Sequence, residues 1–201
     1  MRRLASASSL VCALLAMLAA GCTPGSPYSS FDPKVPCTTD GRFPGAYPDL
    51  EARVPARFAG RGPDTLDSGR NCTAAELGTL AGHGIREVRF AGGTWQLSGE
   101  SGVTLAVFTG DGLTAEWLGE WYESSARGAR STQQITPSRP SVAGRQAYRL
   151  DTVNGQSDQT VITLDAPSAD AAAGIVFVVI AADVPESSIQ DAIAAFPTGG
   201  G

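Results

Sequence analysis

His83 is the only histidine of the chain and therefore its one candidate general base. It lies between two glycines in the segment AGHGI, where the chain is expected to turn. Nucleophilic catalysis would need a serine or cysteine and an orienting carboxylate next to this imidazole. Serines are plentiful, but none lies in a G-x-S-x-G motif. We therefore interpret His83 as a surface loop residue and assign no catalytic residue.

Acidic side chains offer two further kinds of chemistry. Three glutamates fall at helical spacing: Glu116, Glu120 and Glu123. They could act as paired glycosidase carboxylates, but the solvated face of a helix is the simpler interpretation. Three oxygen-bearing residues follow a predicted strand: Asp151, Asn154 and Asp158. Their spacing departs from that of an EF-hand calcium loop, and His83 has no histidine partner for zinc. We expect no metal and no cofactor.

The thiol of Cys22 follows an N-terminal pattern typical of export. The chain opens with Arg2 and Arg3, continues with an apolar run over residues 10–20, and reaches Cys22 through small residues. This run is shorter than the roughly twenty residues that span a bilayer as a helix. It suits the hydrophobic region of a secretory signal, which small residues follow at the cleavage site.

The segment LAAGC at 18–22 resembles the lipobox of bacterial lipoproteins. In that family the signal peptide is removed before the cysteine, whose sulfur then carries a diacylglyceryl group. The resemblance implies a signal peptide over 1–21, a lipidated Cys22 and anchoring at the extracytoplasmic face of the cell membrane. The alternative is an ordinary signal peptide cut after A-x-A, which would leave Cys22 an incidental thiol.

Residues 22–48 are predicted to form a tether, since residues 23–48 contain six prolines and little periodicity. Cys12 is lost with the signal peptide and Cys22 takes the lipid, so Cys37 and Cys72 remain. Two remaining cysteines outside the cytoplasm predict a disulfide. The alternative, a metal site, would need more ligands than the sequence offers.

A single α+β domain is expected over residues 49–197, followed by a disordered tail at 198–201. Thr73 and Glu76 form a capping box and predict a helix over about 74–81. Segments 85–98 and 102–110 have the alternation of strands. Segment 113–126 places two tryptophans, at 117 and 121, at helical spacing. They are interpreted as core anchors, with a sugar-binding platform as the alternative.

The second half of the domain shows three clear patterns. Asn154-Gly155 predicts a hairpin turn, and the apolar run over 174–183 predicts a buried strand. Apolar residues at 189, 192, 193 and 196 predict a final amphipathic helix. The order of elements predicts a mostly antiparallel sheet with two to three helices packed on one side.

This order and the ending are similar to those of secreted bacterial lipoproteins of unknown function, and more loosely to PsbP-like domains. The resemblance covers residues 49–197 and carries only structural motifs. It implies an α+β fold and a cell-envelope location, and it transfers no catalytic residue.

The charge of the chain is unevenly distributed. A formal net charge of −5 argues against nucleic acid as a partner. Residues 124–150 contain five arginines and no acid: Arg127, Arg130, Arg139, Arg145 and Arg149. Residues 151–201 contain seven acids and no base. This asymmetry predicts an arginine surface for an anionic partner, either anionic lipid, wall polymer or another envelope protein. The alternative, and the preferred interpretation, is that folding interleaves the two sets of charges.

Two classes of function remain open. A membrane-anchored binding or interaction module requires no catalytic residues and is preferred. A cell-envelope hydrolase, with a site that the sequence does not reveal, is the alternative.

Overall fold

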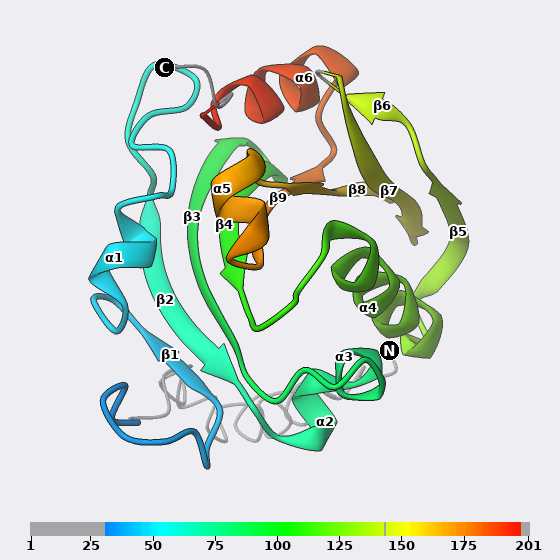
Figure 1. Ribbon diagram of the computed structural model, residues 1–201. Helices are drawn as coiled ribbons and strands as arrows, with labels where there is room; N and C mark the ends of the chain where they lie inside the picture. Colours follow the sequence, from blue (N-terminus) through cyan, green and yellow to red (C-terminus); the bar gives the residue numbers. More distant parts are fainter. Residues whose placement is uncertain (1–30, 143, 198–201) are drawn as a thin grey trace, which may run out of the picture.

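The structure, a computed structural model, describes residues 31–142 and 144–197. The predicted signal peptide, the lipobox with Cys22 and the tail at 198–201 lie outside these ranges. Within them, nine strands form one antiparallel sheet with six helices (Figure 1). The prediction of an α+β fold built on a mostly antiparallel sheet is confirmed.

The strands are β1 (Gly41–Phe43), β2 (Thr65–Asn71), β3 (Val88–Ser98), β4 (Ser101–Thr109), β5 (Thr132–Ser138), β6 (Ser141–Val142), β7 (Arg145–Asn154), β8 (Ser157–Asp165) and β9 (Ile175–Ala182). The helices are α1 (Pro48–Glu51), α2 (Ala74–Leu77), α3 (Thr79–Gly82), α4 (Ala115–Gly128), α5 (Ser168–Ala172) and α6 (Glu186–Ala194). In space the strands follow the order β1-β2-β3-β4-β9-β8-β7-β5, and β6 pairs with β7.

Strand β9 lies at the centre of the sheet, between β4 and β8, as its continuous apolar run predicts. Its residues alternate between the two faces. Phe177 and Val179 belong to one hydrophobic core, and Val176 and Val178 belong to another. A strand that is covered on both faces needs apolar side chains at every position, which is why no alternation is visible in its sequence.

Helices cover both faces of the sheet, so the prediction of helices on one side is wrong. Residues of α1 and α6 pack in the first core, and residues of α2, α3 and α4 pack in the second. The prediction of two to three helices is also too low for the described residues, which form six. Four of the six are five residues long or less, too short for a periodic apolar pattern to develop.

The predicted helix over 74–81 is two short helices, α2 and α3, separated at Gly78, whose φ is +50°. Thr73 caps α2 as predicted, because its hydroxyl accepts a hydrogen bond from the Glu76 amide. In a complete capping box the Glu76 side chain would also accept a hydrogen bond from the backbone amide of Thr73, and this second bond is not formed. The backbone amide of Thr73 donates to Asp40, not to Glu76, at 2.9 Å.

The structure contains the other elements that the sequence predicts. These are the two strands at 85–98 and 102–110, the helix after them, the hairpin and the last helix. Asn154 pairs with Ser157, so the hairpin turn consists of Gly155 and Gln156. Gly155 has a φ of +67°, which glycine adopts without steric cost. No helix of residues 31–142 and 144–197 is long and apolar enough to cross a membrane.

The described part of the predicted tether packs on the domain. Cys37 and Cys72 form a disulfide with 6.0 Å between their Cα atoms, as predicted. Strand β1 pairs with β2 and extends the sheet. Arg70, whose side chain is almost completely buried, donates to the carbonyls of Val35 and Thr39. Described residues before the predicted domain start at residue 49 therefore already pack on the sheet.

Candidate functional site

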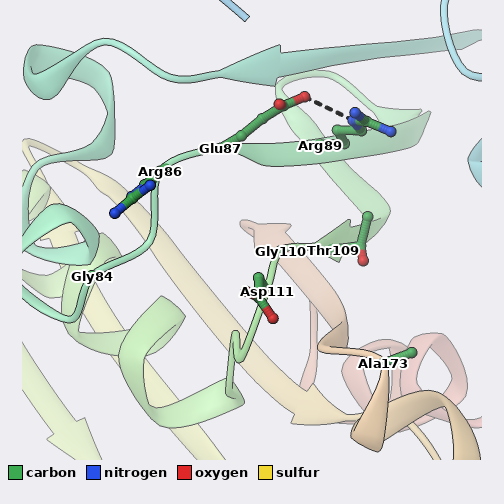
Figure 2. A pocket seen from close by; sticks show the side chains of 8 residues that line it. All are labelled: Gly84, Arg86, Glu87, Arg89, Thr109, Gly110, Asp111 and Ala173. Carbon is green, nitrogen blue, oxygen red and sulfur yellow. Dashed lines mark hydrogen bonds and ion pairs between the residues drawn. The ribbon is translucent and has the colours of Figure 1, made fainter. Parts of the chain in front are cut away.

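A polar pocket of about 660 Å³ opens where three turns of the chain meet (Figure 2). We call it the Arg86–Asp111 pocket. Its walls come from the loop before β3 with the start of that strand, from the end of β4 with the loop that follows, and from the end of α5. The lining residues are Gly84, Arg86, Glu87, Arg89, Thr109, Gly110, Asp111 and Ala173.

Glycines let these turns approach one another. Gly84 has a φ of +83° and reverses the chain after α3. The amide of Gly110 donates to the carbonyl of Gly174 at 3.3 Å. A Cβ atom on Gly174 would lie 2.0 Å from the Gly110 carbonyl oxygen, a distance that no side chain tolerates. The contact between the β4–α4 loop and the α5–β9 corner therefore requires glycine at position 174.

Arg89 and Glu87 form an ion pair at the pocket. The Arg89 Nε atom donates to Glu87 Oε1 at 2.7 Å, and this hydrogen bond raises the pKa of the guanidinium. The Arg89 guanidinium also lies 5.2 Å from the centre of the Tyr47 ring, within range of a cation–π interaction. Both contacts hold Arg89 at the edge of the pocket.

The other two charged residues of the pocket, Arg86 and Asp111, form no ion pair with each other. Arg86 and Asp111 are exposed, and neither has a hydrogen-bond or ion-pair partner among residues 31–142 and 144–197. In Figure 2 Arg86 extends from the loop before β3, and Asp111 extends from the loop after β4. The pocket therefore presents one free cation and one free carboxylate on separate walls.

His83 lies beside this pocket but does not line it. Its Nε2 atom is 3.1 Å from Glu120 Oε2, and its ring stacks on Trp117 with 4.4 Å between ring centres. Within the described ranges, the side chain of His83 has these two partners and no serine or cysteine neighbour among its contacts. The arrangement supplies a carboxylate and an imidazole but no nucleophile.

Each of the three helical glutamates has its own partners. Glu116 accepts from Arg139 at 2.9 Å, and Glu120 contacts His83. Glu123 accepts from Tyr148 and from Arg127. The hydrogen bond from Tyr148 lowers the pKa of Glu123, with a further contribution from Arg127. The three carboxylates thus follow one face of α4, and each is engaged by partners from the rest of the fold.

The residues considered for calcium are not assembled into a metal site. Asp151 accepts from Arg149 at 2.9 Å and from Thr160 at 2.7 Å. Asp158 lines a second pocket of about 280 Å³ together with Asp151 and Glu186. Across the described part of the chain, no group of three or more His, Cys, Asp or Glu side chains could hold a metal ion.

The five arginines of residues 124–150 lie among acceptors. Arg127 pairs with Glu123, Arg139 with Glu116, and Arg149 with both Asp151 and Glu186. Arg145 donates to the carbonyl of Asp165 at 3.0 Å. Arg130 is exposed and has no partner within the residues described. The fold thus interleaves acids with most of the predicted arginine surface.

The two tryptophans of α4 pack, partly buried, against the second core. The Trp121 indole donates to the carbonyl of Glu76 at 3.0 Å and so joins α4 to α2. These contacts support the interpretation of both rings as core anchors.

Comparisons with protein-family models, with curated proteins and with solved structures found no match to this chain. The role of the Arg86–Asp111 pocket therefore rests on its own geometry and charges.

Sequence reasoning did not predict this pocket. Arg86 and Asp111 stand in turns, where charged residues are common and carry no periodic pattern. Glycines at 82, 84, 110 and 112 mark these segments as loops. Only the pairing of β3 with β4 brings the two loops together, because Arg89 opposes Thr109 at that end of the ladder.

Proposed function

We propose that the protein is a lipid-anchored, extracytoplasmic binding module that holds a small polar ligand in the Arg86–Asp111 pocket. The observation that carries the binding role is the presence of two unpaired, opposite charges in one open pocket. Polar groups that line a concavity of this size are typical of ligand sites.

The proposed location is supported by two features. The segment LAAGC at 18–22 resembles a lipobox, and the Cys37–Cys72 disulfide suits an oxidising compartment. A lipid on Cys22 would hold the domain near the membrane, since each buried methylene contributes about 0.8 kcal/mol. The segment between Cys22 and the disulfide would then set the distance of the pocket from the bilayer.

A weaker, additional contact with anionic lipid or wall polymer would use the arginines of α4 and the following strand. Arg127 and Arg139 keep about half of their side-chain surface exposed, at 57% and 54%, in spite of their ion pairs. Arg130 is exposed as well. Such a contact would compete with Glu123 and Glu116 for these guanidinium groups and would weaken with salt.

The anchored location is tested by fractionating cells that express the full chain or its Cys22→Ser variant. We expect the wild type in the membrane fraction, with a mass increase on the Cys22 peptide, and the variant in the medium. Thermal shifts of the purified protein with low-molecular-weight envelope extract then test the binding role. A wild type that stays in the membrane without a mass increase would contradict the lipid anchor, and an extract without effect would contradict the binding role.

A further inference from the structure

The charges of the Arg86–Asp111 pocket indicate which class of small polar ligand it binds. We propose that this pocket binds the zwitterionic form of a short peptide, with Arg86 on the terminal carboxylate and Asp111 on the terminal ammonium. The inference rests on the proposed function and names the ligand class for the same site.

The first step concerns which charges a ligand can use. Glu87 already neutralises Arg89 through a 2.7 Å hydrogen bond, so the pair offers no net charge. Arg86 and Asp111 have no partner within the described chain and are held on different loops. A simple anion would satisfy Arg86 but would meet the carboxylate of Asp111 in the same pocket. A ligand with both charges satisfies both residues.

The second step concerns the strength of such contacts. Arginine binds a carboxylate through two parallel N–H donors, and these charge-assisted hydrogen bonds are shorter and stronger than neutral ones. The carboxylate of Asp111 can in turn accept hydrogen bonds from an ammonium group. The hydroxyl of Thr109, which also lines the pocket, can donate to or accept from the peptide backbone between them.

The third step concerns ligand length. A free amino acid carries its two charges on one carbon atom, whereas Arg86 and Asp111 come from separate walls and do not meet. An extended chain advances by about 3.3–3.6 Å per residue, so two or three residues separate the terminal charges by roughly 7–11 Å. A pocket of about 660 Å³ has room for such a peptide.

The test uses the full-length protein in detergent and isothermal titration with five probes. These are trialanine, N-acetyl-trialanine, trialanine amide, free alanine and inorganic phosphate. We expect trialanine to bind at least about tenfold more tightly than the probe that lacks the ammonium or the probe that lacks the carboxylate, the scale on which one charge-assisted contact acts. Free alanine and phosphate should bind still more weakly.

Two variants assign each charge to its residue. Arg86→Gln should weaken trialanine binding about tenfold but leave the binding of trialanine amide unchanged. Asp111→Asn should weaken trialanine binding by a similar factor and leave N-acetyl-trialanine unchanged. The matched controls are Arg57→Gln and Asp191→Asn, which remove exposed charges outside the pocket lining. Neither control should change binding of any probe.

Three results would overturn the assignment. Phosphate or N-acetyl-trialanine binding as tightly as trialanine would show an anion site, and equal binding of free alanine would show an amino-acid site. Failure of trialanine to bind would reject a peptide ligand. In each case envelope extract could still shift the melting temperature of the wild type, so failure of the ligand class is distinguishable from failure of the binding role.

Discussion

Single glycines determine how closely the walls of the Arg86–Asp111 pocket approach one another. Gly174 and Gly112 both have positive φ values, +67° and +71°, but their surroundings differ. A Cβ on Gly174 would meet the Gly110 carbonyl at 2.0 Å, whereas a Cβ on Gly112 would have nothing within 4 Å. A side chain at Gly112 would therefore cause only backbone strain, whereas one at Gly174 would cause backbone strain and steric overlap.

Gly174→Ala should lower the free energy of unfolding by about 2–5 kcal/mol, from left-handed strain of about 1–2 kcal/mol plus overpacking of about 1–3 kcal/mol. Gly112→Ala should lower it by about 1–2 kcal/mol, because only the strain applies. Urea denaturation of both variants and the wild type measures the difference. Equal losses at the two positions would show that the turns do not meet as described.

At the scale of elements, α6 is held on the first core by one face. Ile189, Ala192 and Ile193 are buried, and Phe196 stacks on Phe177 of β9 with 4.6 Å between ring centres. Gln190 lies on the opposite face, exposed, and donates to Glu186 at 2.8 Å. The amphipathic pattern in the sequence thus matches the packing of this helix.

Ile193→Ala removes buried methylene groups and should lower the free energy of unfolding by about 2–5 kcal/mol. Gln190→Ala, on the exposed face, should change it by less than about 0.5 kcal/mol. Chemical denaturation followed by tryptophan fluorescence compares the two. Similar losses would contradict the assignment of the buried face.

At the scale of the whole molecule, the segment before β1 is attached to the domain by a disulfide and by hydrogen bonds to a carboxylate. Beside the Cys37–Cys72 disulfide, Asp40 accepts hydrogen bonds from the amides of Cys72 and Thr73 and from the Thr73 hydroxyl. Burial opposes ionisation of Asp40, but these hydrogen bonds outweigh it and hold its pKa below the usual 3.8. Ionised Asp40 therefore joins the first described segment to the start of α2.

The depressed pKa of Asp40 fixes the pH range in which it stabilises the fold. Its contribution is fully present above about pH 3.8, the usual value, and is lost as the pH falls through the lower folded-state pKa. Asp40→Asn should therefore lower the free energy of unfolding by about 1–3 kcal/mol at pH 7, where hydrogen bonds to a charged group are lost. The difference from wild type should shrink as the pH falls below 3.8.

Denaturant titrations at pH 7, 4 and 2.5 measure this dependence. Asp191→Asn is the control, because Asp191 is exposed and its side chain has no partner within the described ranges. A deficit of Asp40→Asn that does not change with pH would mean that the charge of Asp40 contributes nothing.

Several features of this protein were determined by the sequence alone. The capping residue Thr73, the hairpin at Gly155, the central strand β9 and the final helix α6 follow from local pattern, because each depends on neighbours within one turn or one strand. The disulfide followed from the count of remaining cysteines and the predicted compartment.

Three features depend on tertiary structure alone. They are the formation of the polar strands, the packing of helices on both faces of the sheet, and the position of the site. Strands β2 and β5 have polar sequences, TLDSGRN and TQQITPS, and become strands because β3 and β7 offer free edges. Helices pack on both faces because apolar side chains point to both sides of β9. The charges at Arg86 and Asp111 share a pocket because β3 and β4 pair in a fixed register, a non-local contact that no local pattern of residues records.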